Sequence, residues 1–315
     1  MKGIILVAGN GTRLAPTTLA VSKPLLPVFD KPMIYYPLAT LIDAGIKDIL
    51  IITNEKDKQK FIDLLGNGNE LGINLCYEVQ HVQRGIADAF IVGKDFIKDD
   101  NVCLILGDNL FCGESIAKQT CKSAKLQSGA EIYGCQVDDP RRFGVAVFDE
   151  NKNVTAVEEK PQRPKSHFAV TGLYFFDNSV VKIAENIKPS LRGELEITDV
   201  INEYIKRNQC RINELESDVK WMDVGTFGSL LEASNYVAKI QQNGTYLGCI
   251  EESAFNRKYI DHEQLLSLCG RQSKSEYGMH LRSVAYKEID DILNHYRNKD
   301  CKEEFSEGLE CDTRN

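Results

Sequence analysis

The strongest constraint on the fold is a regular alternation of short apolar runs with helical patterns across the first part of the chain. The runs at 48–53 (DILIIT) and 102–106 (VCLIL) are apolar at successive positions rather than at every second one. Such runs are typical of strands buried on both faces, as in a parallel sheet that helices cover. The alternation therefore predicts βαβ crossovers. Strands are expected at 3–7, 48–53, 74–79 and 102–106, and helices at 36–44, 56–65 and 86–96.

After about residue 130 the apolar runs follow one another more closely, with turn residues between them. This spacing is typical of antiparallel strands added to a sheet. Strands are expected at 130–137, 144–148, 154–158 and 169–176, then helices at 179–186 and 197–207, a strand pair at 211–214 and 220–224, and helices at 227–241, 263–269 and 277–296. The pattern predicts an α/β fold with a Rossmann-like mixed, mostly parallel sheet flanked by helices, and with C-terminal helices.

The chain of 315 residues carries no proline- or glycine-rich linker that would divide it. We assign residues 1–240 to an α/β core and 241–297 to a C-terminal helical segment of the same domain. Residues 298–315 are polar and charged without an apolar period, so a disordered tail is expected there.

The net charge of −8 argues against nucleic acid as a partner, because phosphate backbones need a basic face. No apolar stretch approaches the ~20 residues of a membrane span, so no membrane partner is expected. The N-terminus lacks a signal-peptide pattern, and the ten cysteines are scattered without a C-x-x-C pair, which indicates reduced thiols in the cytoplasm. The five histidines show no zinc spacing, so no metal site built from cysteine or histidine is expected.

A glycine-containing loop, residues 7–14 (VAGNGTRL), follows the first expected strand. It lacks the Lys-Ser or Lys-Thr of a P-loop, and Leu14 stands where a dinucleotide fingerprint has its third glycine. A nicotinamide-dependent oxidoreductase is therefore a poor match. The loop still offers backbone N–H groups to an anion, and Arg13 adds a forked donor. A phosphate-binding loop is one prediction, and a plain structural turn is the alternative.

Polar residues follow several of the expected strands, in the segments VAGNGTR, EVQ, LGDN, EEKP and MDVG. Ligands of open α/β sheets bind outside the carboxyl ends of the strands, so a site is expected where these ends converge. Asp108 follows a buried strand, and a carboxylate there is a natural Mg²⁺ ligand. Asp223 supplies a second carboxylate, and Lys23 lies in a loop that prolines stiffen (SKPLLP).

Together these segments resemble the sugar nucleotidyltransferase family, and within it the glucose-1-phosphate thymidylyltransferases. The motifs stand in the family's order over roughly residues 2–290. They read AGNGTRLAPTT, SKPLLP, KPMIYYPL, LGDN, RRFGV, EEKP, AVTGLYFFD, RGELEITD, WMDVGT and CIEESAFNRKYID. The resemblance implies the nucleotide-diphospho-sugar transferase fold and a nucleotidyltransferase that joins dTTP and glucose 1-phosphate, or another hexose 1-phosphate, to give dTDP-glucose and pyrophosphate. It also implies a homotetramer, with C-terminal helices that pack between subunits and can border a regulatory nucleotide-sugar site.

In the implied reaction the sugar phosphate attacks the α-phosphate in line. Positioning and charge neutralisation supply most of the rate, without a protein nucleophile. The catalytic residues implied by the resemblance are Arg13, Lys23, Asp108 and Lys160. The implied nucleotide-binding residues are Ala8, Gly9, Gly11, Thr12, Arg13, Gln80 and Gly85. The implied sugar-binding residues are Asn109, Gly144, Glu159, Thr171 and Tyr174. The implied Mg²⁺ ligands are Asp108 and Asp223. Arg141 and Arg142 are expected to form a surface turn.

The sequence departs from the family pattern at two places. Ala8 stands where the family usually has glycine, and a negative φ there would tolerate the methyl group. The usual Q-P-x-P-x-G appears as residues 80–85 (QHVQRG), so both prolines are missing and Arg84 adds a cation near the base. These departures leave dTTP and UTP open as substrates. A binding or regulatory protein without turnover is a further alternative, against which the intact set of site residues argues.

Overall fold

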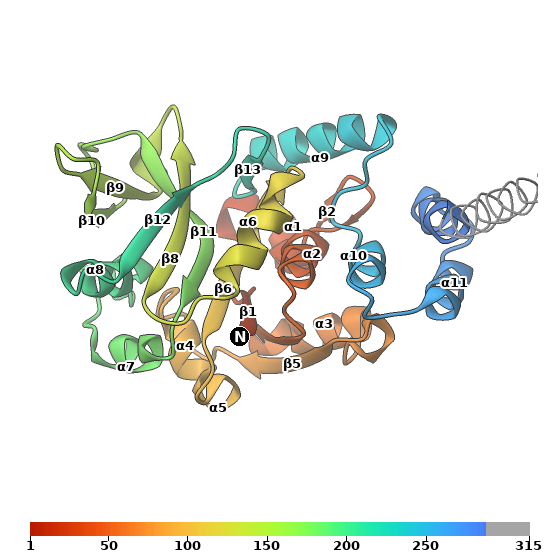
Figure 1. Cartoon of the computed structure of the whole chain (residues 1–315), viewed down its shortest axis with the longest axis horizontal. Helices are drawn as coiled ribbons and strands as arrows, with labels where there is room; N and C mark the ends of the chain where they lie inside the picture. Colours follow the sequence, from red (N-terminus) through yellow and green to blue (C-terminus); the bar gives the residue numbers. More distant parts are fainter. Residues whose placement is uncertain (288–315) are drawn as a thin grey trace, which may run out of the picture.

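The protein is described by a computed structural model over residues 1–287. Within these residues a nine-stranded sheet forms the centre, and two short ribbons lie beside it (Figure 1). The strands of the sheet are β1 (Lys2–Leu6), β4 (Asp48–Thr53), β5 (Asn74–Val79), β6 (Val102–Leu106), β8 (Ala130–Gln136), β9 (Gly144–Phe148), β10 (Val154–Glu159), β11 (Phe168–Phe176) and β12 (Cys210–Glu214). The ribbons are β2 (Pro27–Val28) with β3 (Lys31–Pro32), and β7 (Asn109–Cys112) with β13 (Lys220–Asp223).

The sheet has the order β10-β9-β11-β6-β1-β4-β5, with β8 paired to β11 and β12 paired to β8. Strands β6, β1, β4 and β5 run parallel, as the apolar runs of β4 and β6 and their alternation with helices predicted. Strands β8 to β11 pair antiparallel, as the closer spacing predicted. All nine residues of β11 are buried, because strands lie on both sides of it and helices cover the sheet. The predicted fold class is confirmed.

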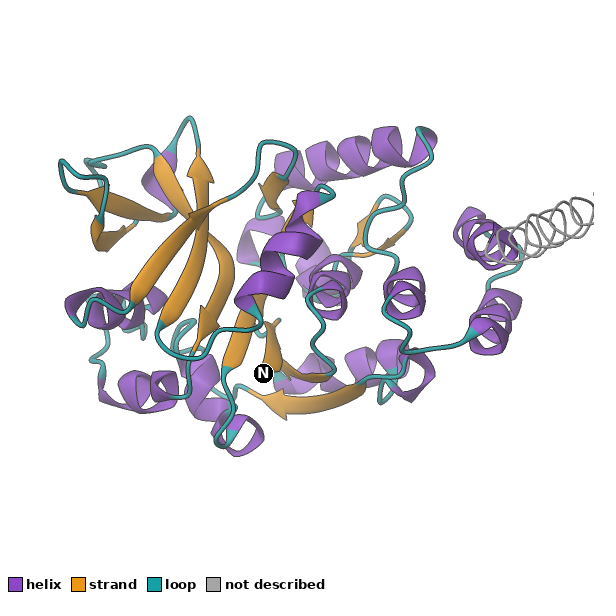
Figure 2. Ribbon diagram, viewed as in Figure 1, coloured by secondary structure: helices purple, strands orange, loops and turns teal. Residues whose placement is uncertain are grey.

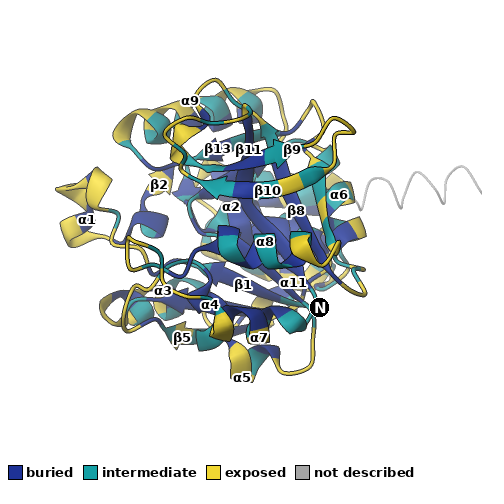
Figure 3. Ribbon diagram, turned by 90° about the vertical axis from the view of Figure 1, so that its left-hand side faces the viewer, coloured by how far each residue is buried: buried dark blue, intermediate teal, exposed yellow. Residues whose placement is uncertain are grey.

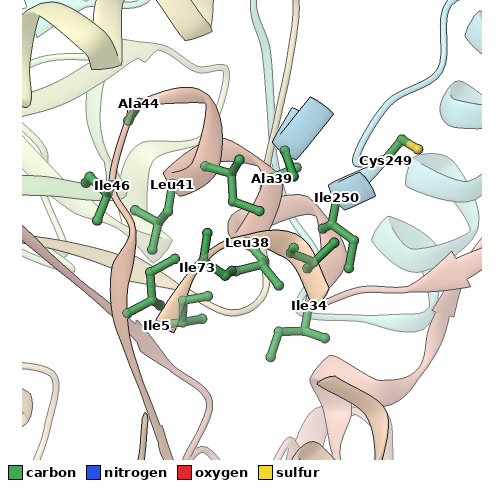
Figure 4. Close-up of a cluster of buried hydrophobic side chains, with 14 of the residues drawn as sticks. Ile5, Ile34, Leu38, Ala39, Leu41, Ala44, Ile46, Ile73, Cys249 and Ile250 are labelled. Atoms are coloured by element: carbon green, nitrogen blue, oxygen red, sulfur yellow. The ribbon is translucent and has the colours of Figure 1, made fainter. Parts of the chain in front are cut away.

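Helices cover both faces of the sheet (Figure 2). One face carries α2 (Tyr35–Asp43), α3 (Lys58–Leu65), α6 (Ser115–Ser123), α10 (Ile250–Asn256) and α11 (His262–Arg271). The other face carries α4 (Asp88–Val92), α5 (Lys94–Ile97), α7 (Ser179–Asn186) and α8 (Ile197–Lys206). On the first face Leu38 and Leu41 of α2 pack among Ile5, Ile73 and Ile250 (Figure 4). This packing places α10 on the same core as the sheet.

The remaining helices lie away from these two faces. Helix α9 (Phe227–Gln242) packs Ala233 and Val237 against Val28 of the β2–β3 ribbon. The short α1 (Thr17–Ala20) is largely exposed at the edge of the molecule (Figure 3). Short 3-10 helices occupy Thr12–Leu14, Lys23–Leu25, Glu55–Asp57, Asn69–Leu71 and Pro140–Arg142.

Two predicted elements differ from the structure. The helix expected at 86–96 is divided into α4 and α5 at Gly93, which packs so tightly that a Cβ would lie 2.9 Å from the Ala89 carbonyl oxygen. The strand pair expected at 211–214 and 220–224 does not form, because β12 pairs with β8 and β13 pairs with β7. The sequence patterns also missed β7, α6 and α10, which are short and carry few apolar residues outside the buried face.

The C-terminal part agrees with expectation as far as it is described. Residues 276–287 are helical, so the helix expected at 277–296 begins one residue earlier than predicted. The rest of that helix and the tail predicted at 298–315 lie outside the described residues. The domain boundary proposed at residue 240 falls inside α9. No helix within residues 1–287 is both long and apolar enough to cross a bilayer.

Candidate active site

The glycine-containing loop connects the end of β1 to the 3-10 turn that begins at Thr12. Gly11 has φ +60°, and a Cβ there would lie 3.0 Å from side-chain atoms of both Lys23 and Thr18. Gly9 has open space where a Cβ would stand. Ala8 is buried with a negative φ, so its methyl group fits the backbone, as expected. The loop therefore needs glycine at position 11 for its conformation, while position 9 leaves the approach to the backbone clear.

The two predicted metal ligands are brought together by the β7–β13 ribbon. Its register pairs Asp223 with Asn109, the neighbour of Asp108, and the Val224 N–H donates to the Asp108 carbonyl oxygen over 2.9 Å. Burial and the charge of Asp108 raise the pKa of Asp223 above its ordinary value. Lys23, Arg13 and Arg142 act in the opposite direction. The two carboxylates thus share one electrostatic environment.

Three cations surround this carboxylate pair. The Lys23 ammonium is ion-paired with Asp108 and is itself buried. The Arg13 guanidinium lies against Gly225: a Cβ on residue 225 would stand 2.8 Å from Arg13 Nη2. Arg142 Nη2 donates to Asp223 over 3.2 Å. The cationic side chains can bind a phosphate group, and the two carboxylates can bind a metal cation beside it.

Arg141 and Arg142 lie in an exposed turn, as predicted, and Arg142 in addition contacts Asp223. Arg141 does point to the surface, where it pairs with Asp139 on the same turn. Arg142 is half exposed but turns its guanidinium toward the buried carboxylate. The proline-led 3-10 turn Pro140–Arg142 separates the directions of the two neighbouring side chains.

Replacing Arg142 by alanine is expected to move the acidic limb of the pH–activity profile to higher pH. Arg142 is one of the charges that lower the pKa of Asp223, so its loss raises that pKa further and the ionised form is reached at higher pH. The measurement is kcat/KM against pH at fixed Mg²⁺. Arg141→Ala is the matched control and should leave the limb in place. An equal shift in both variants would contradict the assignment.

The donor set at Asp108 and Asp223 fits a hard divalent cation. Carboxylate oxygens are the ligands such ions take. Like charge from Asp108 raises the pKa of Asp223, and a bound cation would relieve that repulsion. In the structure the Lys23 ammonium partly compensates the pair by contacting Asp108.

A second charged cluster gathers the predicted sugar-phosphate residues. Lys160 Nζ lies 3.0 Å from Glu159 Oε1, and Arg192 Nη2 lies 3.3 Å from the same carboxylate. Arg192 also forms a forked contact with Glu196, with its Nη2 2.8 Å from one of the oxygens. Gly144 borders the cluster, since a Cβ there would stand 3.8 Å from Glu159 Oε2. Two cations near one surface can receive a phosphate group.

A chain of contacts joins the two clusters. The Lys160 backbone N–H donates to the Phe143 carbonyl oxygen, and the Phe143 ring packs edge-on against Trp221 at 4.9 Å between centroids. Trp221 Nε1 donates to Asn109 Oδ1 over 2.6 Å, and Asn109 Nδ2 donates to Asp108 over 2.9 Å. Asn109 also accepts from the Gly172 N–H. Its amide therefore holds Asp108 in place, and the predicted contact of Asn109 with sugar hydroxyl groups stays a prediction.

The remaining predicted sugar residues lie below the surface. Thr171 is buried, and its hydroxyl donates to the Tyr133 carbonyl oxygen over 3.1 Å. Tyr174 is buried and stacks on Phe176. Burial and the nearby charges of Glu159 and Asp108 raise the pKa of Tyr174. Tyr174 thus lies beneath both clusters, while the hydroxyl of Thr171 already has a partner.

The predicted base-binding residues form a loop beside the phosphate loop. Gln80 is buried, and its Nε2 donates to the Gly85 carbonyl oxygen and to Asp88. Gly85 has φ +105° and lies close to Leu195. A Cβ on residue 85 would stand 2.5 Å from the Leu195 carbonyl oxygen. Arg84 pairs with Asp88 over 2.7 Å. The cation expected to act near the base is therefore engaged by a carboxylate of its own loop.

Gln83 connects this loop to the phosphate loop. Its Nε2 donates to the Ala8 carbonyl oxygen over 2.7 Å, and its Oε1 accepts from Asn10 Nδ2 over 3.0 Å. Gln83, Trp221 and Arg192 had no predicted role. The motifs RGELEITD and WMDVGT contained two of them, but only the tertiary contacts show which side chains they meet.

Residues 2–240 match the family model described as nucleotidyl transferase, which spans most of the chain. The chain belongs to the nucleotidyl transferase family. A glucose-1-phosphate thymidylyltransferase of Neisseria meningitidis (serogroup A / serotype 4A) is 49% identical over 289 residues, which cover 91% of this chain and 100% of that protein. One of Mycolicibacterium smegmatis is 46% identical with the same coverage.

Solved nucleotidyl transferase structures share the fold. A Bacillus anthracis protein, provisionally named a glucose-1-phosphate thymidylyltransferase and solved in complex with sucrose, has a TM-score of 0.70 and 42% identity. The match covers 75% of this chain and 94% of that one. A UDP-glucose pyrophosphorylase complexed with UDP-glucose has a TM-score of 0.68 and 25% identity, with 76% and 98% covered.

Proposed function

We propose that this nucleotidyl transferase joins dTTP and glucose 1-phosphate to give dTDP-glucose and pyrophosphate. The observation that carries the proposal is a pair of charged clusters joined by a chain of contacts: a carboxylate pair with Arg13, Lys23 and Arg142 around it, and a second cluster around Lys160 and Arg192. Two polyanionic substrates need two cationic sites beside one another. The names of the relatives, at up to 49% identity over nearly the whole chain, indicate which substrates these are.

In this proposal the phosphate loop and its cations bind the nucleotide. The backbone of Gly9 and Gly11, with Thr12, would hold the triphosphate, and Lys23 would exchange its contact with Asp108 for phosphate oxygens. Arg13 would lie on the β- and γ-phosphates that depart as pyrophosphate. Gln80 would place the pyrimidine, since both of its amide hydrogens are held within the loop and its carbonyl oxygen can accept from the base.

The second cluster would bind the sugar phosphate. Lys160 and Arg192 would take its phosphate group, and the Glu159 carboxylate that they now share would be released to accept from sugar hydroxyl groups. A phosphate oxygen would then attack the α-phosphorus as the bond to the β-phosphate breaks. The electron pair of that bond leaves with pyrophosphate, and no proton has to move. Orientation and charge stabilisation are the contributions required of the protein.

Asp108 and Asp223 would hold Mg²⁺ in this scheme, with Asn109 and the Val224 N–H fixing the position of Asp108. Bound Mg²⁺ would neutralise phosphate oxygens and act as a Lewis acid toward the α-phosphate. Arg13 would complement it by stabilising negative charge on the leaving group.

The proposal is tested by measuring pyrophosphate release with each of dTTP, UTP, ATP and GTP against glucose, galactose and mannose 1-phosphates, with and without Mg²⁺. The expected result is the highest kcat/KM for dTTP with glucose 1-phosphate, and none without a divalent ion. Inactivity with every pair would favour a binding protein without turnover. The structural likeness to a UDP-glucose pyrophosphorylase makes UTP preference the second candidate, which the same assay identifies.

Replacing Gln83 by alanine is expected to raise the KM for the nucleotide about 30-fold, because two hydrogen bonds of roughly 1 kcal/mol each hold the base loop to the phosphate loop. The kcat should change less, since neither bond reaches the second cluster. The measurement is steady-state kinetics with dTTP and UTP.

Val82→Ala is the control for this prediction, because Val82 is an exposed side chain of the same loop. Gln83→Glu keeps the acceptor for Asn10 but sets a carboxylate oxygen against the Ala8 carbonyl oxygen and adds negative charge beside the phosphate loop, so it should raise the KM at least as much as Gln83→Ala. If Gln83→Ala and Val82→Ala behave alike, the loop contact has no role in nucleotide binding.

We extend the proposal to a homotetramer, as the resemblance implies. Light scattering of the purified chain measures its mass in solution directly. A monomer at assay concentrations would contradict this part of the proposal alone.

A further inference from the structure

Three metal-ligating side chains meet at a place remote in sequence from the candidate active-site motifs. Cys249 is the N-cap of α10, Glu252 lies one turn further along that helix, and His280 comes from the helical residues 276–287. The sulfur, a carboxylate oxygen and an imidazole nitrogen all lie within 4.8 Å of one another. Figure 4 shows Cys249 beside Ile250 at the edge of the apolar core.

We propose that Cys249, Glu252 and His280 bind Zn²⁺. Sulfur, nitrogen and oxygen donors together are typical of zinc, whereas Mg²⁺ takes oxygen ligands. Zinc bonds of about 2.0–2.3 Å in tetrahedral geometry place ligand atoms roughly 3.3–3.6 Å apart. The donor atoms need only small side-chain shifts to reach this spacing from separations of at most 4.8 Å.

The site is arranged before any ion arrives. His280 Nε2 lies 2.7 Å from Glu252 Oε2, so both groups already point at one locus. The Tyr246 ring stacks on the His280 imidazole at 3.5 Å between centroids and 5° between planes, which fixes the ring orientation. Cys249 is buried, and its thiol would bind as the thiolate, so ion binding releases a proton. In metal sites, neighbouring groups usually orient the ligand side chains, as the Tyr246 ring orients His280 here.

An ion can reach the site from solvent. Cys249, Glu252 and Tyr246 line an open cavity of about 760 Å³ between α2 and α10. Three protein ligands leave zinc a fourth position, which water or a small anion can take. The ion would also connect α10 to the helix at 276–287 and so hold the C-terminal segment on the core. The sequence spacing concealed this site, because His280 lies 28 residues from Glu252.

The test is a titration of the reduced full-length protein with Co²⁺, in excess Mg²⁺ so that the carboxylate pair of the candidate active site is occupied. We expect one equivalent to give intense tetrahedral ligand-field bands and a thiolate-to-cobalt charge-transfer band, both displaced by Zn²⁺. Cys249→Ser should lose the charge-transfer band. Cys269→Ser, which removes another buried thiol, should keep it.

His280→Gln supplies a second measurement if Cys249→Ser does not fold. It should weaken Zn²⁺ binding by at least about tenfold, the loss that even outer partners of a metal site cause. It should also abolish the rise in Tm that Zn²⁺ gives the unsubstituted chain. A chain without the charge-transfer band, or a band that survives in Cys249→Ser, would overturn the proposal, whatever the outcome for nucleotidyl transfer.

Discussion

Replacing Asp223 by asparagine is expected to lower kcat by about 10³-fold, because a catalytic metal supplies several kcal/mol of transition-state stabilisation. Asp223 pairs across the β7–β13 ribbon with Asn109, the neighbour of Asp108, and each carboxylate would be needed to hold the ion. The KM for the nucleotide should rise much less, since Lys23 and the phosphate loop remain. Activity should depend on Mg²⁺ with a weakened apparent affinity, which a metal titration of initial rates measures.

Stability separates this effect from misfolding. Burial and the charge of Asp108 raise the pKa of Asp223, so the fold disfavours its charged form. An uncharged amide of the same size removes that cost, and Tm at neutral pH should stay the same or rise. Glu232→Gln, on exposed α9 beside the same ribbon, is the matched loss of charge and should leave kcat unchanged. If Asp223→Asn lowers both kcat and Tm, the loss of activity comes from misfolding, and the metal-ligand assignment is contradicted.

How much of the fold the sequence predicts depends on how local each signal is. The bounds of β4 and β6 agree with expectation because each carries a run of apolar residues at successive positions. The partner of β13 could not be predicted, because Trp221 meets Asn109 across 112 residues and β7 has only four residues. Local patterns identified strands but not their pairing.

In the candidate site, too, local motifs identified residues but not the contacts between them. Motifs identified Asp108, Asp223 and Lys23, which the fold brings together. Arg142 was expected at the surface because a turn rich in arginine is usually solvated, and its partner Asp223 lies 81 residues away. Trp221 and the Gly172 N–H contact the amide oxygen of Asn109, and neither partner was predicted. These are contacts between distant segments, which a linear pattern does not encode.

Replacing Arg13 by alanine is expected to lower kcat by about 10³-fold, the lower part of the range for an arginine that stabilises a transferring phosphate. In our proposal the guanidinium contributes most when charge develops on the departing pyrophosphate, so kcat should fall more than nucleotide binding weakens. Single-turnover rates together with the dissociation constant for dTTP measure the two effects separately.

Gly225→Ala tests whether the position of Arg13, and not only its charge, is required. A Cβ at residue 225 would stand 2.8 Å from Arg13 Nη2, so the methyl group must displace the guanidinium. Gly225 has no positive φ, so alanine does not strain the backbone there. We expect this variant to keep its Tm and to lose part of the kcat that Arg13→Ala loses. Gly228→Ala, where a Cβ has room, is the matched control.

If Gly225→Ala retains full activity, Arg13 acts from a different position than the structure gives it. If Arg13→Ala itself retains kcat, negative charge on the leaving group must be stabilised by Lys23 and the bound metal ion alone.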